Sequence, residues 1–429
     1  MNMISNIPFD PEKKRVVIVG GGFGGLELAG KLNPKYFQII LLDKNNYYQF
    51  QPLLYQVAIT GLEESSIAYP FRKNFQKKQI HFRMCGLTRV IPEENMIETT
   101  IGNLTYDYLV LACGCDTNFF GNNELKDTTL TLKSVSEAIF LRNHILQSFE
   151  DATVTEDVDE LKKLLTFVIV GGGATGVESA GALADLKNFV LPKDYPEIDF
   201  SKMEIRLIDA SPRLLVGMSE HASFHTAEIL KKRGVIIHQG VSVSSCENDI
   251  ITISDGTTLH SKNVLWVAGI RGIILEGLNL ENYGKGDRII VNEYCQINGS
   301  ENIFAIGDAA IMQTPDYPNG HPQMAQGAIQ MANLMGKNLE KIIKGQQPDK
   351  FQYKDKGSLA TIGRNAAVAD IGKLECSGRV AWWLWLWVHI FAILGVKNKI
   401  LVMLNWAWNY VTYDISLRLL IRPIRPKCE

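Results

Sequence analysis

A pattern of hydrophobic positions followed by glycines occurs twice along the chain. Residues 15–27 read RVVIVGGGFGGLE, and residues 166–178 read TFVIVGGGATGVE. A short continuous apolar run is typical of a strand buried on both faces of a parallel sheet, and the glycines mark a turn into a helix. The repeat therefore predicts two separate βαβ units of the kind that binds a dinucleotide.

Further apolar runs predict the remaining strands of each unit. Residues 37–42 and 108–112 are expected to join the first sheet, and residues 204–208 and 264–268 the second. A later run, residues 302–306, ends in Gly-Asp and is expected to return to the first unit rather than extend the second.

The predicted fold class is α/β, with two Rossmann-like dinucleotide-binding domains and a C-terminal membrane-anchoring region of amphipathic helices. A chain of 429 residues is long enough for two or three domains. The first domain is expected to be discontinuous, and the acidic, polar residues 151–163 are expected to connect the two units. The predicted boundaries are 1–120 with 287–350, then 121–286, then 351–429.

The first glycine motif, Gly20-x-Gly22-x-x-Gly25, lies between a predicted strand and a predicted helix, and Asp43 ends the next strand. The glycines permit a tight turn and a close approach of a pyrophosphate, and the helix N-terminus supplies N–H donors. Asp43 can accept a hydrogen bond from a ribose hydroxyl. Such turns also occur for packing alone, but strand, helix and acid together favour a dinucleotide site.

The second motif, Gly171-x-Gly173-x-x-Gly176, repeats this context, with Asp209 at the end of the following strand. An acid there favours NADH, because it accepts from the 2′-hydroxyl and repels a 2′-phosphate; two nearby arginines leave NADPH open. Two dinucleotide sites in one chain indicate a bound flavin and a nicotinamide that delivers hydride to it.

The electron acceptor is less evident from the residues. Cys113-x-Cys115 follows a predicted strand, where two small buried side chains are the simpler interpretation and a redox-active pair is the alternative. The sequence has no Cys-x-x-Cys or Cys/His cluster of the kind that holds iron–sulfur or zinc.

A second candidate for the acceptor site is a helix predicted to carry Pro322 in its first turn. Gln326 and Gln330 lie four apart and so share one face of it. Their amides are able to bind the carbonyl of a flavin or quinone, although glutamines on a helix are more often plain surface.

The last fifty residues combine aromatic and basic character. Residues 380–396 contain a single ionisable side chain, His389, and six of the seven tryptophans lie at positions 382–408. From Lys397 onward, six basic residues face two acidic ones, a net charge of +4 within a chain of net charge −2. Apolar, aromatic and cationic residues together favour helices lying in a membrane interface, over a buried helix pair or a spanning helix. The overall charge argues against nucleic-acid binding.

These residues together resemble the type II NADH:quinone oxidoreductases. The resemblance is carried by both glycine motifs, by residues 50–58 (FQPLLYQVA), by residues 325–330 (AQGAIQ) and by the aromatic tail, and it runs from about residue 13 to 422. The glycine motifs are shared with other flavoproteins of this architecture, whereas the Gln-x-x-x-Gln motif and the tail are its most specific parts.

The resemblance implies a respiratory flavoenzyme with non-covalent FAD, no metal or iron–sulfur cluster, NADH as substrate and a membrane quinone, ubiquinone or menaquinone, as acceptor. It also implies a peripheral membrane enzyme, no proton pumping and a homodimer. The aromatic and basic tail leads us to expect monotopic attachment, on the cytoplasmic face of the cell membrane, with an anionic lipid surface as partner. Glu178, Gln326 and Gln330 are the expected catalytic residues. The expected FAD contacts are Gly20, Gly22, Phe23, Gly24, Gly25, Asp43, Lys44, Ala112, Asp308, Ala325 and Gln326. The expected NADH contacts are Gly171, Gly173, Gly176, Glu178, Asp209, Ala268 and Gly269.

Two other functions share parts of this pattern. A sulfide:quinone oxidoreductase would use Cys113 and Cys115 at the flavin and no nicotinamide. An apoptosis-inducing-factor-like flavoprotein would bind NADH only to change conformation. Turnover with quinone separates the second alternative from an enzyme.

Overall fold

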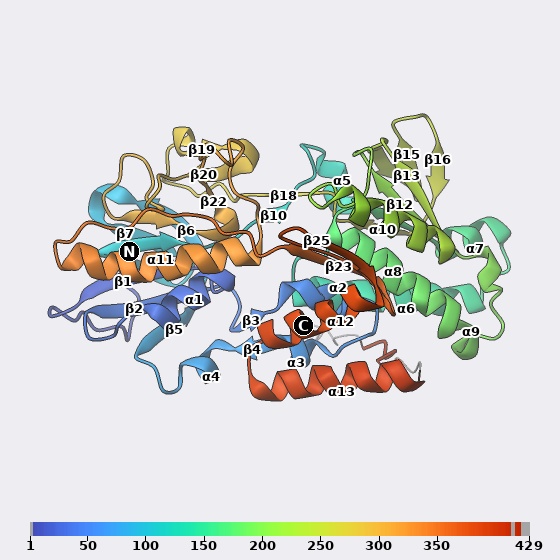
Figure 1. The fold of residues 1–429 in the computed structure, drawn as a ribbon, viewed down its shortest axis with the longest axis horizontal. Helices are drawn as coiled ribbons and strands as arrows, with labels where there is room; N and C mark the ends of the chain where they lie inside the picture. Colours follow the sequence, from blue (N-terminus) through green and yellow to red (C-terminus); the bar gives the residue numbers. More distant parts are fainter. Residues whose placement is uncertain (1–2, 413–416, 422–429) are drawn as a thin grey trace, which may run out of the picture. The chain divides into compact units, whose positions relative to one another are not determined.

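The computed structural model describes residues 3–412 and 417–421, and the chain forms two compact units (Figure 1). The first unit takes Met1–Tyr48, Tyr69–Asp116 and Ile270–Asp355, and the second takes Gln49–Ala68, Thr117–Gly269 and Lys356–Glu429. Each unit is therefore built from segments that are distant in the sequence. The domain boundaries given above stay a prediction.

The first unit contains a parallel five-stranded sheet of order β21-β9-β1-β2-β5. Its strands are β1 (Lys14–Val19), β2 (Phe37–Asp43), β5 (Ile80–Met84), β9 (Tyr108–Leu111) and β21 (Ile303–Ala305). Residues 16–18 and 109–111 are fully buried, as expected for strands covered on both faces. The pairing of β21 with β9 confirms that residues 302–306 return to the first sheet.

Two helices of the first unit lie against each other, α1 (Phe23–Lys31) and α11 (Ala325–Ile343) (Figure 1). A side chain at Gly24 would lie 3.2 Å from Ile306 and 3.4 Å from the carbonyl of Ala328, so this glycine permits the close approach. Two small sheets complete the unit: β6 (Leu87–Ile91), β7 (Met96–Thr99) and β8 (Gly102–Thr105); and β19 (Tyr283–Gly284), β20 (Arg288–Ile290) and β22 (Ala310–Ile311).

The second unit contains a parallel four-stranded sheet of order β13-β12-β11-β17. Its strands are β11 (Thr166–Val170), β12 (Glu204–Asp209), β13 (Val235–Gln239) and β17 (Asn263–Trp266), with an antiparallel sheet of β14 (Val243–Glu247), β15 (Ile250–Ile253) and β16 (Thr258–His260). The helices of this unit include α2 (Leu54–Ala58), α3 (Glu64–Ile67), α5 (Asn123–Thr128), α6 (Val135–Thr153), α7 (Val158–Leu165), α8 (Ala174–Phe189), α9 (Leu191–Asp194) and α10 (Glu220–Lys232). The strands predicted from the apolar runs are confirmed in both units.

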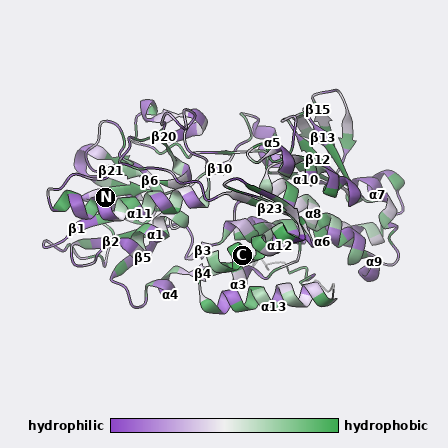
Figure 2. Cartoon of the chain, in the orientation of Figure 1, coloured by the Kyte–Doolittle hydropathy of each residue, from purple (hydrophilic) through white to green (hydrophobic). Residues whose placement is uncertain are grey.

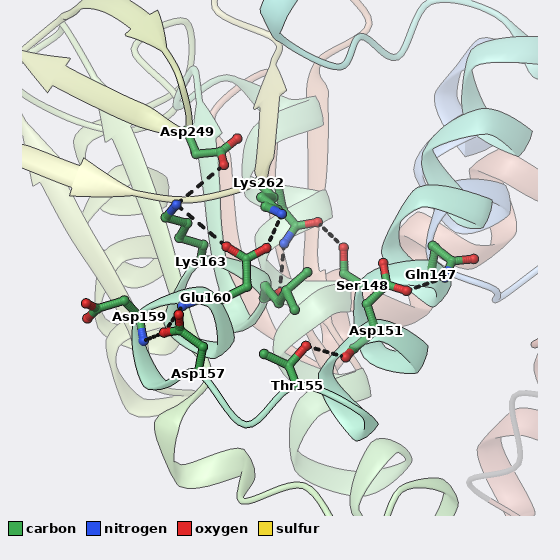
Figure 3. A network of polar contacts seen from close by, with 12 residues as sticks. Gln147, Ser148, Asp151, Thr155, Asp157, Asp159, Glu160, Lys163, Asp249 and Lys262 are labelled. Atoms are coloured by element: carbon green, nitrogen blue, oxygen red, sulfur yellow. Dashed lines mark hydrogen bonds and ion pairs between the residues drawn. The ribbon is translucent and has the colours of Figure 1, made fainter.

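The acidic segment that was expected to connect the units lies inside the second unit instead, as the end of α6 and most of α7 (Figure 3). Asp157 caps α7 by accepting from the Asp159 N–H at 2.9 Å. Glu160 pairs with Lys262 and Lys163, and Lys163 also lies 3.7 Å from Asp249. One acid of this segment, Glu160, therefore pairs with two lysines, and another, Asp157, caps a helix, so the segment is part of the second unit and not a linker.

The C-terminal part of the second unit is an antiparallel sheet followed by two helices. Its elements are β23 (Ser358–Gly363), β24 (Ala366–Ile371), β25 (Leu374–Gly378), α12 (Arg379–Ala392) and α13 (Val396–Thr412). β23 packs on α8, where a side chain at Gly181 would lie 2.3 Å from the carbonyl oxygen of Ile362. Residues 366–369, in β24, are buried.

The break between the two C-terminal helices is short. It covers residues 393–395, where Gly395 has a φ of +87°, and α13 begins at Val396. Lys397 and Lys399 belong to the first turn of α13. α12 ends at Ala392 because Ile393 is extended, and Gly395 adopts the left-handed conformation directly before α13 without the steric penalty that a side chain would add.

Candidate functional site

The first glycine motif forms a turn in which side chains are excluded at two positions and tolerated at one. A Cβ at Gly20 would lie 2.3 Å from the Ala112 carbonyl oxygen, and a Cβ at Gly25 only 1.8 Å from the Gly20 carbonyl oxygen. A Cβ at Gly22, by contrast, would have no atom within 4 Å. Gly22 thus borders open space directly before the first turn of α1, which fits a dinucleotide pyrophosphate held by helix N–H groups.

Asp43 ties the end of β2 to this turn. Its Oδ2 accepts from the Gly21 N–H and its Oδ1 from the Asn45 N–H, both at 2.7 Å. Burial raises the pKa of Asp43, while those two N–H donors and Lys44 oppose the shift. Each carboxylate oxygen keeps a second lone pair, so the side chain is still able to accept from a ribose hydroxyl.

The second motif repeats the geometry in the other unit. A Cβ at Gly171 would lie 2.5 Å from the Val267 carbonyl oxygen, whereas at Gly173 no atom lies within 4 Å. Asp209 accepts from the Gly172 N–H through one oxygen and from the Ser211 N–H at 2.6 Å through the other. Each unit therefore offers the same open turn with an acid beside it.

Asp308 follows β21 in the first unit, in a short turn that also contains Gly307. Its carboxylate accepts from the Cys115 thiol at 3.4 Å and raises the pKa of the buried Arg288, against the larger lowering effect of burial. Burial raises the pKa of the Cys113 thiol to about 12, so this cysteine is protonated at neutral pH. A thiolate pair of the kind that sulfide oxidation needs is therefore disfavoured.

Gln326 and Gln330 both contact the segment that leaves the first unit. Gln326 donates to Asp355 Oδ1 at 3.2 Å, while Gln330 donates to the Lys354 carbonyl and accepts from the Lys354 N–H, each at 2.9 Å. The helix that carries them begins at Ala325. The prediction that Pro322 lies in its first turn is therefore wrong, since Pro322 precedes the helix. The two amides nevertheless share one face of α11, as the four-residue spacing requires.

Glu178 is the most unusual carboxyl group of the second unit. It lies in α8 with 7% of its surface exposed, and its Oε1 accepts a long 3.4 Å hydrogen bond from the Thr361 N–H. Burial raises its pKa to about 8, opposed by that N–H and by the nearby Trp385 indole, which completes no hydrogen bond of its own. Glu178 is therefore mostly protonated at neutral pH, and it is able to release this proton at a pH only slightly above neutral.

Several groups around Glu178 were not identified from the sequence alone. Tyr55, on α2, is buried, and the negative charge of Glu178 adds to the effect of burial in raising its pKa well above 10. The His389 ring stacks on Trp385 with 4.1 Å between centroids, and its Nδ1 contacts the Trp385 carbonyl oxygen at 2.8 Å. Burial lowers the pKa of His389 to about 4, so the ring is neutral. The signal for Tyr55 was its place in the motif at 50–58.

The two C-terminal helices expose many apolar side chains, and two amides of α13 form hydrogen bonds within the second unit. Exposed positions include Val380, Trp383, Trp387, Phe391, Val396, Leu404, Trp408 and Val411. In α13, the Asn398 amide donates to the Ala68 carbonyl at 3.1 Å, and the Asn409 amide donates to that of Gly61 at 3.3 Å. Figure 2 shows the apolar character of both helices. Within the described part of the chain, no helix combines the length and apolarity that a membrane crossing needs.

Comparisons with known proteins agree with this architecture. A family model described as pyridine nucleotide-disulphide oxidoreductase matches residues 14–332, and a model of the NDH2 C-terminal domain matches residues 356–412. A type II NADH:quinone oxidoreductase of Mycobacterium tuberculosis is 35% identical, over 94% of this chain and 89% of that protein. One of Staphylococcus aureus (strain MSSA476) is 28% identical, over 86% of this chain and 92% of that protein.

Solved structures show the same fold at low sequence identity. NDH2 from Plasmodium falciparum in complex with NADH matches with a TM-score of 0.87 and 23% identity, covering 96% of this chain and all of that one. A sulfide:quinone oxidoreductase of Aquifex aeolicus matches less well, with a TM-score of 0.73 and 19% identity, over 94% of this chain and 96% of that one. The length and identity of the sequence matches show that the chain belongs to the pyridine nucleotide-disulphide oxidoreductases and, among them, to the type II NADH:quinone oxidoreductases.

Proposed function

We propose that this chain is a peripheral membrane flavoenzyme that oxidises NADH and reduces a membrane quinone without pumping protons. The observation that carries the proposal is the pair of open glycine turns, one per unit, together with a buried, protonated carboxyl group in the unit that also carries the exposed apolar helices. The relatives support the same activity, because curated proteins that align with 94% and 86% of the chain are type II NADH:quinone oxidoreductases.

The first turn is the proposed place of FAD. Gly22 leaves room for the pyrophosphate, Asp43 accepts from the ribose, and Asp308 lies beside the Cys115 thiol in the same unit. When bound there, non-covalent FAD supplies the two-electron redox chemistry. The other proposed FAD contacts are Phe23, Gly24, Lys44, Ala112 and Ala325.

The second turn is the proposed place of NADH. Gly173 leaves the room for the pyrophosphate, and Asp209 offers carboxylate oxygens to the ribose hydroxyls. A carboxylate there repels a 2′-phosphate, which favours NADH over NADPH. Ala268 and Gly269, which follow β17, complete this proposed site.

Glu178 is the proposed proton donor to the quinone. A carboxyl group whose pKa lies near 8 holds its proton at neutral pH and loses it readily to a more basic oxygen. Gln326 and Gln330 are proposed to orient the quinone carbonyl, since amides add hydrogen bonds without adding charge. Both would have to exchange their contacts with residues 354–355 for the quinone.

The exposed apolar faces of α12 and α13 are the proposed membrane anchor, within a C-terminal region of residues 351–429. A helix that hydrogen-bonds amides within the protein and exposes tryptophan and aliphatic side chains fits the interface of a bilayer better than water. Lys397 and Lys399 add positive charge suited to an anionic lipid surface. The proposal also includes attachment to the cytoplasmic face of the membrane and a homodimer. The proposed FAD domain covers residues 1–120 and 287–350, and the proposed NADH domain covers residues 121–286.

The visible spectrum of the purified protein tests this function under anaerobic conditions. Addition of NADH should bleach the flavin absorption, and a short-chain quinone should then restore it. Absence of bleaching would contradict NADH as donor, and bleaching without recovery would contradict quinone as acceptor. Gln326→Ala and Gln330→Ala should slow the recovery more than the bleaching; equal slowing would remove the two glutamines from the quinone site.

A further inference from the structure

A chain of hydrogen bonds links the membrane-facing helix α13 to the surroundings of Glu178. The Trp406 indole Nε1–H donates to Gln56 Oε1 at 2.7 Å, and the Gln56 Nε2–H donates to the Tyr55 hydroxyl oxygen at 2.9 Å. Tyr55 is 4% exposed, and its helix α2 packs on α8, the helix that carries Glu178. All of these residues belong to the second unit.

The Trp406 indole determines which group donates and which accepts in this series of hydrogen bonds. An indole N–H can only donate, so the Gln56 amide must turn its oxygen toward Trp406. Its NH₂ group is then left to face Tyr55, and the Tyr55 hydroxyl must act as the acceptor. A hydroxyl that accepts in one direction keeps its own hydrogen for another acceptor.

We propose that Trp406 and Gln56 are positioning residues that keep the Tyr55 O–H available to donate to the Glu178 carboxylate. That carboxylate forms when Glu178 transfers its proton to an oxygen of the quinone that has taken up the two electrons supplied by NADH: the O–H bond of Glu178 breaks, and an O–H bond forms on the reduced substrate. The inference rests on the proton-donor role assigned to Glu178 under the proposed function.

Tyr55 itself does not pass on a proton in this scheme. Burial raises its pKa well above the ordinary value of 10, and the charge of Glu178 raises it further, so a tyrosinate would be far less stable than the Glu178 carboxylate. Its contribution is a hydrogen bond that exists only after Glu178 has lost its proton. A bond that favours the charged form lowers the pKa of the carboxyl group and favours the transfer.

Two other donors face Glu178, and neither is a hydroxyl. β23 supplies the Thr361 N–H at 3.4 Å, and α12 supplies the Trp385 indole; both lower the pKa of Glu178. The proposed bond from Tyr55 would add to these two. His389, stacked on Trp385, is neutral at pH 7. Farther along α8, the charge of Asp185 is balanced by Arg233. Tyr55 is the hydroxyl whose own ionisation Glu178 affects.

The test is an infrared titration of the Glu178 carboxyl band in the FAD-loaded protein, with Glu178→Gln used to assign the band. Trp406→Phe keeps an aromatic ring but removes the N–H, so the Gln56 amide is no longer held in one orientation and Tyr55 is free to donate to it. The titration midpoint of Glu178 should rise by about one pH unit, the effect of one lost hydrogen bond. Tyr55→Phe should raise it by the same amount.

The double variant decides between positioning and packing. If Trp406 acts through Tyr55, Trp406→Phe should have no further effect on the midpoint in the Tyr55→Phe background. An unchanged midpoint in the single Trp406 variant, or an additive shift in the double variant, would overturn the proposal. Trp382→Phe, a ring on α12 that stacks on Tyr410, is the matched control and should leave the midpoint unchanged.

The infrared readout does not depend on turnover, so it also separates this inference from the proposed function. If the midpoint shifts but quinone reduction by Trp406→Phe keeps its wild-type pH profile, Glu178 is not the proton donor, and the positioning effect still stands. If the pH profile moves with the midpoint, the proton-donor role of Glu178 and the positioning role of Trp406 and Gln56 are both supported.

Discussion

Glu27 and Glu178 occupy the same position in the two copies of the glycine motif, yet their surroundings differ completely. Glu27, on α1, is partly exposed and pairs with Lys31 at 3.6 Å, a surface contact of small energetic value. Glu178, on α8, is buried, and its pKa is raised to about 8. β23 packs on α8, α2 also contacts it, and Trp385 of α12 lies near the carboxyl, which makes one copy of a repeated residue a candidate acid.

The two glycine turns themselves are nearly equivalent, so equivalent substitutions should remove different ligands. In Gly25→Ala and Gly176→Ala the new Cβ would lie 1.8 Å from the carbonyl oxygen of Gly20 or Gly171. We expect Gly25→Ala to lack FAD altogether, and Gly176→Ala to keep FAD but to show no bleaching by NADH. Absorption spectra of the purified variants measure both.

Gly30→Ala, on the exposed side of α1 where the nearest atom is 3.8 Å away, is the control for the first turn and should keep its flavin. Loss of FAD from Gly176→Ala with retention in Gly25→Ala would reverse the assignment of the two turns.

The two glutamates should differ by about two orders of magnitude in their effect on turnover. Glu178→Gln keeps the shape of the side chain but removes the proton that it donates, so steady-state NADH:quinone activity should fall about 100-fold. Glu27→Gln loses only a surface ion pair and should stay within about twofold of the parent. Similar losses in both variants would mean that burial of Glu178 has no role in the reaction.

The exposed apolar residues of the two units should also differ in function. Trp408, on α13, and Leu280, in the first unit, are 58% and 72% exposed. Trp408→Glu should weaken binding to vesicles that contain anionic lipid by about tenfold, whereas Leu280→Glu should leave it unchanged. Vesicle co-sedimentation measures both. Equal binding by the two variants would place the lipid contact away from α13.

The smallest expected effect is on the pH dependence of stability. The pKa of Glu178 is raised in the folded protein from 4.5 to about 8, so the folded state binds the extra proton between these values. The contribution of Glu178 to the free energy of unfolding therefore falls as pH rises from about 5 to about 8. Above that range the folded protein is destabilised by the whole cost of a buried charge at Glu178.

Glu178→Gln removes this penalty, so its Tm should exceed that of the parent by roughly 2 °C or more at pH 9, with a smaller difference at pH 5. Glu27→Gln should show no such trend. Thermal denaturation across this pH range measures the difference, and a constant offset at all pH values would contradict the raised pKa.

Local sequence patterns were sufficient for the strands and glycine turns, because each depends on residues that are close in the chain. The return of residues 303–305 to the first sheet was also predictable from a short apolar run that ends in Gly-Asp. The amphipathic tail followed from its composition. The start of α11 did not, since the first turn of a helix is decided by a few backbone contacts.

The surroundings of Glu178 were beyond local patterns. Tyr55, Thr361 and Trp385 approach it from three segments separated by more than a hundred residues from α8. The repeat alone would have made Glu27 and Glu178 equal candidates. Their difference arises from the tertiary contacts of α8, which no periodicity in either copy reveals.

The most direct test of the account is a stopped-flow comparison of the two half-reactions in the parent, Glu27→Gln and Glu178→Gln proteins, following flavin absorbance. The account predicts that NADH bleaches all three at similar rates, and that quinone restores the absorbance slowly only in Glu178→Gln. Equal recovery in the three proteins, or slow bleaching in Glu178→Gln with normal recovery, would contradict the role of Glu178 as proton donor to the quinone.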